Sequence, residues 1–228
     1  MKPEVIILRM EGHRLSEKYA KMTRTSWEKE GFQCRYFNGI TPQTMKTSPV
    51  RDWIQWGKKD WTNNHDKEKK RLAEEGKLIY YPVFTGTEQA VWHSHLALWK
   101  HIIDDVQRPV ILVEHDGRVV RTPKPVEGDW SDYQFYQLAS NPLGGFYVTP
   151  NFLRGFIRHY RRGREDKKII INSNTDGYMH YWIMAARLSK SFKKKIWTCP
   201  DGRYIVDTKW AKSTINHRRY HEEQVKNE

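Results

Sequence analysis

Runs of apolar residues alternate with amphipathic stretches in the first part of the chain. Residues 5–8 are continuously apolar, which is typical of a strand buried on both faces of a parallel sheet. The pattern then predicts a helix over residues 16–31, where Gly31 ends the helical spacing. A second strand is predicted at 33–37, closed by Asn38 and Gly39. This β-α-β opening predicts an α/β fold with a parallel sheet.

The same patterns continue towards the carboxyl end. One apolar stripe predicts a helix over 87–103, and the apolar run 110–113 predicts a strand that ends in Glu114-His115-Asp116. Further elements are predicted farther on, as strands at 134–138, 169–171 and 196–197 and helices at 151–160 and 176–188. We interpret residues 1–228 as a single domain with a polar, basic tail at about 213–228.

Residues 41–77 differ in amino-acid composition from the rest of the chain. They combine Trp53, Trp56 and Trp61 with many Lys, Asp and Glu residues. We expect a Trp-rich insertion or flexible flap beside the active site. The alternative for the tryptophans is a small hydrophobic cluster beneath the insertion.

Composition narrows the class of protein. Aromatic residues make up 13% of the chain, which argues against disorder, and the formal net charge of +13 favours polyanionic partners. The alternative for the charge is a basic surface kept for solubility. Cys34 and Cys199 are the two cysteines, which favours a reducing compartment. With no apolar run fit for a signal peptide or membrane helix, we expect a cytoplasmic protein, in the host cytoplasm if a phage encodes it.

Two acids at the end of the predicted strand 110–113 carry the strongest chemical signal. Open α/β sheets bind ligands at the carboxyl ends of their strands. Acids two apart on an extended segment point the same way, so Glu114 and Asp116 can face one ligand. Carboxylates are ligands for hard cations such as Mn²⁺ and Mg²⁺. The alternative is that these acids cap the following loop.

An ordered set of segments resembles glycosyltransferase family 25, which contains lipopolysaccharide and collagen galactosyltransferases. The opening strand with Arg14 is similar to the start of that family, as is Phe37-Asn38-Gly39. The resemblance is clearest at Glu88 and Ser94-His95-Leu96-Ala97-Leu98-Trp99, and continues through 111–116 and 144–150. Thr175-Asp176 lies where the family has an aspartate that opens a helix, and Pro200 and 213–215 match its closing elements.

This resemblance implies a GT-A fold, a Rossmann-like nucleotide-binding sheet flanked by helices. It implies a nucleotide-sugar donor, with a UDP-sugar as the first expectation, and a divalent cation, Mn²⁺ or Mg²⁺. Asp116 would bind the metal, and Glu114 would lie near the ribose or the metal's water shell. Arg14 would approach the nucleotide or its diphosphate, and Glu88 and His95 would contribute to the donor pocket. The alternatives are a surface arginine at the helix start for Arg14 and a core residue for His95.

Two residues beyond the central acids complete the expected site. Transfer to a hydroxyl needs a base, and Asp176 is our candidate, with a helix N-cap as the alternative. His180 lies one turn later on the same predicted face and is a candidate third metal ligand, or a packing residue.

Two departures from the family stand out. Its central acid is His115 in this chain, and the segment 41–77 matches no part of the family that we can identify.

The acceptor is inferred from charge and aromatic residues. Basic residues that include Arg158, Arg161 and Arg162 are interleaved with aromatics, as in surfaces that neutralise phosphates and stack on bases. We therefore expect a DNA acceptor, in the form of a hydroxymethylated pyrimidine flipped out of the duplex. Trp53, Trp56 or Trp61 would fill the gap or clamp the base. A lipopolysaccharide or other saccharide acceptor is the rival.

Two hypotheses from other classes stay open. One is a non-catalytic nucleic-acid-binding protein on a degenerate transferase fold, motivated by His115. The other is a metal-dependent nuclease, because acids at strand ends also build nuclease sites.

Overall fold

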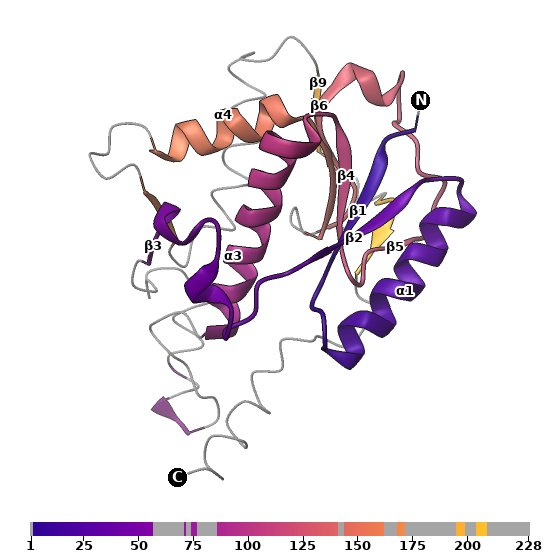
Figure 1. Cartoon of the computed structure of the whole chain (residues 1–228). Coiled ribbons are helices and arrows are strands. Elements are labelled where there is room, and N and C mark those ends of the chain that lie inside the picture. The colour runs from indigo at the N-terminus through magenta and orange to yellow at the C-terminus, as the bar shows by residue number, and fades with distance from the viewer. Residues whose placement is uncertain are drawn as a thin grey trace.

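The computed structural model describes a set of helices and strands that follows the predicted order closely (Figure 1). The described residues are 2–56, 71, 74–76, 86–140, 144–161, 168–171, 195–198 and 204–208. The strands are β1 (Glu4–Arg9), β2 (Cys34–Asn38), β3 (Ile54–Trp56), β4 (Val110–Glu114), β5 (Arg118–Val119), β6 (Tyr133–Gln137), β7 (Gly145–Val148), β8 (Ile169–Ile171), β9 (Lys195–Trp197) and β10 (Val206–Asp207). The helices are α1 (Arg14–Lys29), α3 (Gly86–His101) and α4 (Pro150–Arg161), with short turns η1 (Met45–Thr47), η2 (Arg51–Trp53), η3 (Ile102–Val106) and η4 (Trp130–Asp132).

Six strands in the described part form one mixed sheet in the order β2-β1-β4-β7-β6-β9. Strands β2, β1 and β4 are parallel, β7 is antiparallel to both its neighbours, and β6 and β9 are parallel. The α/β prediction is therefore confirmed, but the purely parallel sheet is wrong. The reason is the short connection between β6 and β7, because a short connection joins strands only in antiparallel pairs.

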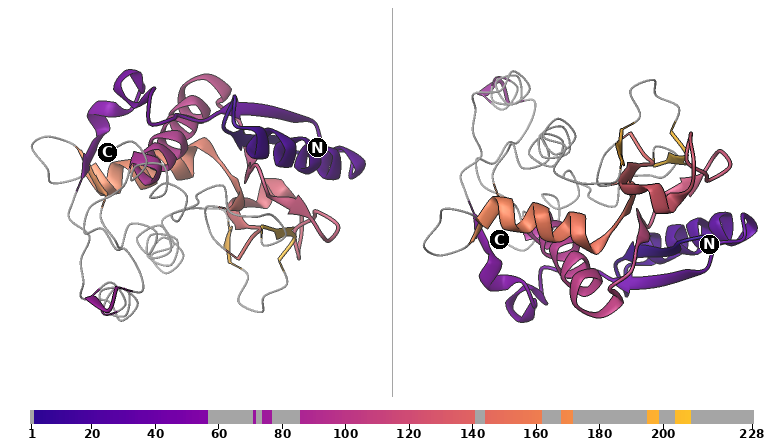
Figure 2. Two further views of the ribbon diagram at one scale, coloured as in Figure 1. Left: turned by 90° about the horizontal axis from the view of Figure 1, so that it is seen from below. Right: turned by 90° about the horizontal axis from the view of Figure 1, so that it is seen from above.

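Alternate residues of the parallel strands face opposite layers of the molecule. Ile6 and Leu112 belong to the cluster that α3 and α4 cover, whereas Ile7 and Ile111 belong to the cluster that α1 covers. This explains the continuous apolar run in β1, since both of its faces are buried. In both views of Figure 2, α1 and α4 lie at opposite ends of the molecule.

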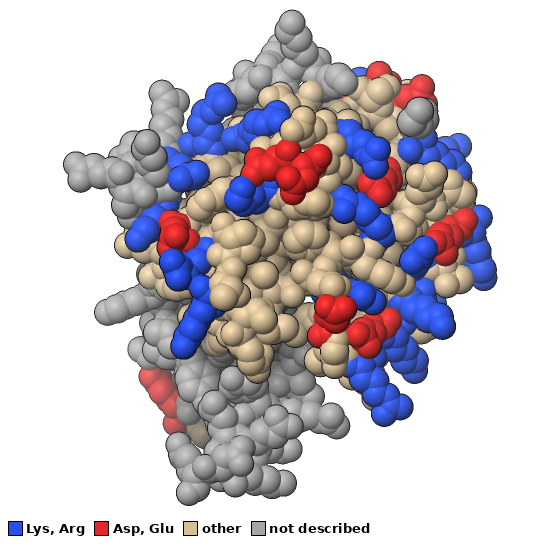
Figure 3. Space-filling view, in the orientation of Figure 1, with Lys and Arg blue, Asp and Glu red and all other residues tan. Residues whose placement is uncertain are grey.

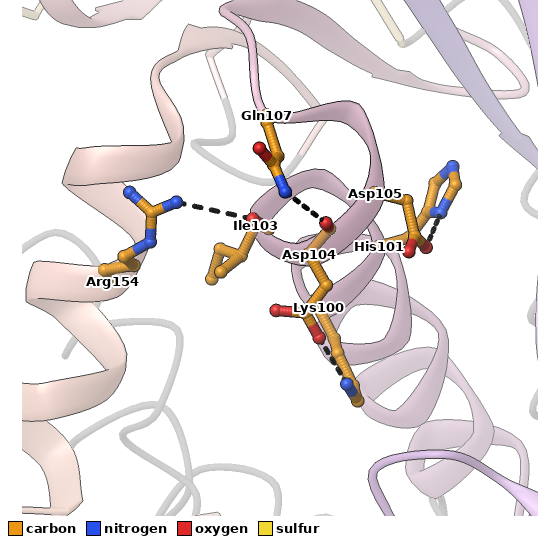
Figure 4. Close-up of polar contacts among 7 residues, drawn as sticks. All are labelled: Lys100, His101, Ile103, Asp104, Asp105, Gln107 and Arg154. Carbon is orange, nitrogen blue, oxygen red and sulfur yellow. Dashed lines mark hydrogen bonds and ion pairs between the residues drawn. The ribbon is translucent and has the colours of Figure 1, made fainter.

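A single turn of π-helix joins α3 to β4. The turn η3 closes with Gln107 in the left-handed region at φ 52°, whose N–H donates to the Ile102 carbonyl over 2.9 Å. Figure 4 shows side chains fixing this turn: Lys100 pairs with Asp104, and Arg154 of α4 donates to the Ile103 carbonyl. The wider turn ends the helix just before Val110, where β4 begins.

The described part of the expected flap, residues 41–56, is tied to the domain. Val50 and Ile54 are buried in the core under α3, and β3 pairs in parallel with β8. His93 of α3 contacts the Ser48 hydroxyl through Nδ1 at 2.8 Å. Apolar residues thus anchor 41–56 to the core on both sides of η2, and the choice between an insertion and a flap for 41–77 stays a prediction. The remainder of the expected insertion lies mostly outside the described residues.

None of the described helices combines the length and the apolar character needed to cross a membrane.

Candidate functional site

A cavity opens at the carboxyl ends of β1, β2 and β4, on the side towards the start of α3. Its walls come from four places in the chain: Leu8, Arg9, Met10, Gly39, Ile40, Thr87, Ala90, Val91, Ser94, Glu114, His115 and Asp116. The chain runs from β1 to β2 on one side and later returns to β4 on the other side of β1. Such a reversal of strand order is where open α/β sheets form their ligand crevice. The location agrees with the site expected from Glu114 and Asp116.

Residues 114–117, which follow β4, form an acidic turn. Two hydrogen bonds from side chains of α1 hold this turn in place. Thr23 Oγ1 donates to the His115 carbonyl at 2.7 Å, and Trp27 Nε1 donates to the Gly117 carbonyl at 3.0 Å. Thr23 and Trp27 are fully buried, so both hydrogen bonds are shielded from water. Within the turn, the Gly117 N–H donates to the Glu114 carbonyl at 2.9 Å.

Gly117 is required by the closeness of this turn to β4. A Cβ atom there would lie 2.8 Å from Val113 Cβ and 3.3 Å from the Gly144 carbonyl oxygen. Neither neighbour is the far end of a flexible side chain, so a larger residue has to displace the strand or the turn. The glycine thus lets the acids follow immediately after the strand.

Glu114 is oriented by a buried histidine of α3. His95 Nε2 lies 3.2 Å from Glu114 Oε1, and the His95 side chain is only 3% exposed. The His95 ring is also 6.4 Å from the Trp99 ring, which limits its movement. His95 was predicted to contribute to the donor pocket. In the structure it positions Glu114 through this contact and is not itself among the cavity-lining residues.

Among the residues of the site, Asp116 has the pKa that is shifted most from its ordinary value. The pKa of Asp116 is raised to about 7, chiefly by burial and also by the negative charges of Glu114 and Asp207. Asp207 is the last residue of β10, which pairs with β5 just after the acidic turn. The sequence analysis missed Asp207, although the run Ile205-Val206-Asp207 repeats the signal of apolar residues ending in an acid. A third carboxylate therefore contributes to the electrostatics of the site.

His115 lies on the α1 side of the turn. Its ring stacks on Tyr19 with the ring centroids 6.2 Å apart and the planes 11° apart. Burial lowers the pKa of His115, and the nearby His13 lowers it again, although Glu114 opposes the shift. The imidazole is therefore held neutral near pH 7. His115 thus adds an aromatic contact between the turn and α1.

Ser94 joins α3 to the loop after β2. The Ile40 N–H donates to Ser94 Oγ at 2.7 Å, and Ser94 Oγ donates to the Ala90 carbonyl at 2.7 Å. A Cβ at Gly39 would lie 3.0 Å from Ser94 Oγ and 3.2 Å from the Arg9 carbonyl oxygen. This close packing forms the cavity wall opposite the acidic turn.

Arg9 supplies the positive charge in the cavity wall. Its guanidinium lies 4.3 Å from the centre of the Tyr36 ring, and its Nε donates to Asn38 Oδ1 at 3.0 Å. The sequence analysis assigned the nucleotide-binding arginine to Arg14. Arg14 is exposed at the first position of α1 and is not part of the cavity lining. Arg9 lies at the carboxyl end of β1 and is among the cavity-lining residues.

The other predicted site residues fall into two groups. Glu88 lies in the first turn of α3 and is half-buried, one residue from the cavity-lining Thr87. Asp176, His180 and Arg162 lie outside the described residues, so their roles stay predictions.

The predicted acceptor-binding aromatics pack against the core on another face of α3. Trp53 and Trp56 are half-buried against the cluster beneath α3 and α4. The Trp53 ring lies 5.8 Å from Lys100 Nζ and 5.4 Å from the Arg161 guanidinium, and Arg158 is exposed on α4. Trp53 and Arg161 therefore lie close together, and the arrangement also matches the packing alternative for the tryptophans.

The acids at the cavity match the ligand preferences of a hard cation. Glu114 raises the pKa of Asp116 by repulsion, and a bound cation relieves such repulsion. Within the described residues, no three His, Cys, Asp or Glu side chains form a metal-binding group. Mg²⁺ is commonly held by one or two carboxylates together with substrate phosphates. The donor set present therefore fits a cation that binds together with a phosphate-containing ligand.

Comparison with protein-family models gives no match for this chain, and comparison with curated proteins gives none either.

Proposed function

We propose that this protein is a metal-dependent glycosyltransferase that takes a hexosyl or pentosyl group from a nucleotide sugar, a UDP-sugar in the first instance. One observation carries the proposal: the cavity at the reversal of strand order combines Arg9 with the paired acids Glu114 and Asp116. Such a crevice suits a nucleotide. A diphosphate needs positive charge on one side and a cation-binding carboxylate on the other, and this wall offers both.

The chain's own residues would bind and orient the donor in distinct ways. Arg9 would contact the diphosphate, since a guanidinium suits phosphate oxygens. His95 would keep Glu114 turned towards the cavity, where its second oxygen can accept from a ribose hydroxyl. Ser94 would hold the loop at Ile40 against the bound nucleotide.

Asp116 would hold the divalent cation, with Glu114 beside it. A bound cation supplies neutralisation of the charge that develops on the leaving diphosphate. Burial of Asp116 strengthens its electrostatic interaction with a cation, because the surrounding dielectric is lower than that of water. We also propose, as part of the same function, that the α/β fold is of the GT-A type.

The proposed acceptor is a hydroxyl group in DNA, in the form of a hydroxymethylated pyrimidine. The formal charge of +13 supports a polyanionic acceptor. The acceptor hydroxyl must lose a proton during transfer. Asp176 remains our prediction for the base.

Mass spectrometry of acceptors tests this function. The protein is incubated with Mn²⁺ and a panel of sugar nucleotides, together with unmodified DNA, hydroxymethylcytosine DNA or a lipopolysaccharide core. A hexose or pentose mass gain on hydroxymethylcytosine is expected. A gain on the saccharide alone would replace the DNA acceptor with the rival. No gain on any acceptor, and equal inertness of wild type and Asp116→Ala towards every donor, would refute the enzyme. Nicking of plasmid in Mn²⁺ without a sugar nucleotide would indicate a nuclease.

A further inference from the structure

A row of basic side chains runs along the exposed ridge of α1. Arg14, Lys18, Lys21 and Lys29 are all exposed, with Thr25 between the last two. At 100° per residue, these positions fall within one narrow stripe of the helix. Figure 3 shows Lys and Arg side chains following α1 along the right side of the molecule.

These four cations form no ion pair with the other described residues, and the acids on the same helix have partners. Glu17 accepts from the Gly12 N–H at 2.9 Å, and Glu28 pairs with Arg24 at 2.6 Å. With five Lys and Arg against two Glu, the helix presents a net positive charge.

The row begins beside the cavity. Met10, which lines the cavity, is joined to α1 because its N–H donates to Ser16 Oγ at 2.9 Å. From Arg14 to Lys29 the ridge extends about 22 Å at 1.5 Å per residue. Consecutive cations are separated by about 4.5 to 12 Å along the axis. A single diphosphate cannot span this length, whereas a phosphodiester backbone presents successive charges along a line.

The segment after β5 extends the same basic surface. The Val119 N–H donates to Ser26 Oγ at 3.2 Å, which joins this segment to α1. Arg121 and Lys124 follow, and both are exposed. No acid occurs between Arg118 and Glu127, so the segment adds further positive charge.

An anionic membrane is a less suitable partner for this surface. An interfacial helix inserts a broad apolar face among the lipids. The apolar face of α1 is already buried against the sheet through Tyr19, Ala20 and Trp27. Leu15 and Met22 are exposed by 39% and 41%, but they lie at one flank of the row.

We propose that the row Arg14-Lys18-Lys21-Lys29 on α1 binds the phosphodiester backbone of a nucleic acid and leads the strand to the cavity. This inference rests on the proposed function in one respect, namely that DNA is the acceptor. It assigns the docking surface to α1 rather than to the basic residues of α4. The two helices lie at opposite ends of the molecule, so their contributions can be separated (Figure 2).

Anisotropy of labelled DNA tests the surface with the full chain. One variant carries R14Q, K18Q and K21Q, and a matched control carries K46Q, R154Q and R158Q, which changes the charge equally. The α1 variant is expected to bind at least about tenfold more weakly near 0.1 M salt, and its slope of log K against log salt should fall by about 2 to 3. The control should change by less than about threefold, and a K18R/K21R variant should bind like wild type.

Four outcomes would overturn the proposal: wild type that does not bind DNA, a larger loss in the control, equal losses in both, or an α1 variant that loses binding to phosphatidylserine vesicles but not to DNA. Circular dichroism confirms that each variant is folded. The Asp116→Asn variant separates this test from the enzymatic one, because it should lose transfer but keep DNA binding. Normal DNA binding without transfer would refute the enzyme and leave the docking surface standing.

Discussion

His95 Nε2 lies 3.2 Å from Glu114 Oε1, across the gap between α3 and the end of β4. This contact joins α3 to the acids that follow β4. It gives His95 a positioning role, because the ring is buried and does not line the cavity.

Replacing His95 should therefore weaken donor binding. His95→Leu removes a hydrogen bond to a charged group, a loss of about 1.5 to 3 kcal/mol, or roughly 10- to 100-fold in affinity. His95→Gln carries an amide that can reach the former Nε2 position, and it should retain most of the affinity. Calorimetric titration with UDP in Mn²⁺ measures both. Equal affinity of the two variants would show that the contact does not position Glu114.

Asp116 makes stability depend on pH. Its folded-state pKa of about 7 exceeds the ordinary value of 3.8, so the proton binds more tightly in the folded state. The stabilisation from that proton is complete below about pH 3.8 and is lost as pH rises through about 7. Above pH 7, the free energy of unfolding of Asp116→Asn should exceed that of the wild type by up to about 4 kcal/mol. Urea unfolding without metal, at a series of pH values, measures the difference.

A bound divalent cation should offset the loss of stability that ionised Asp116 causes in the wild type. Mn²⁺ with UDP should raise the melting temperature of the wild type at pH 8, since a ligand that binds only the folded state stabilises it. Asp116→Asn should gain much less. If both proteins gain equally, Asp116 is not a cation ligand.

Thr23 should matter to the site although it lies on α1. Thr23→Val keeps the shape and removes the hydroxyl that donates to the His115 carbonyl. We expect a loss of about 1 to 2 kcal/mol in unfolding free energy and weaker UDP binding. Thr25→Val is the matched control, because Thr25 lies on the same helix but is exposed. Comparable loss of UDP binding in both variants would contradict a specific role for Thr23.

Gly117 should not tolerate a methyl group. Gly117→Ala places Cβ 2.8 Å from Val113 Cβ, and overpacking of this kind costs about 1 to 3 kcal/mol. Gly86→Ala is the control, because its nearest contact, at 3.7 Å from Pro42 Cβ, is an ordinary one. Urea unfolding compares the two variants. Equal stability would mean that the acidic turn adjusts freely.

The spacing of apolar residues along the chain predicted those helices and strands in which this spacing is most regular. The strand at 5–8, the helix at 16–31 and the strand at 110–113 correspond to β1, α1 and β4. Each buries a continuous run or one stripe of side chains, so its local sequence determines its type. The acids at the cavity were predictable for the same reason, since they follow a buried strand directly.

Relationships between distant segments were not predictable from such patterns. The pairing of β3 with β8 and the approach of Asp207 to Asp116 depend on how the chain returns through space. That Arg9 lines the cavity and Arg14 does not depends on how the end of β1 faces α3, which local pattern does not give. The sequence marked Trp53 as unusual, but not that its ring would lie between Lys100 and Arg161.

Donor turnover at the Asp116 site tests the central claim most directly. Release of nucleoside diphosphate from a panel of nucleotide sugars in Mn²⁺ is measured for wild type and for Asp116→Asn. Wild type should release diphosphate from at least one donor, and Asp116→Asn should release it at least about 100-fold more slowly, as expected when a catalytic cation is lost. Equal release by the two proteins, or none by wild type from any donor, would contradict the assignment of this cavity as a glycosyltransferase site.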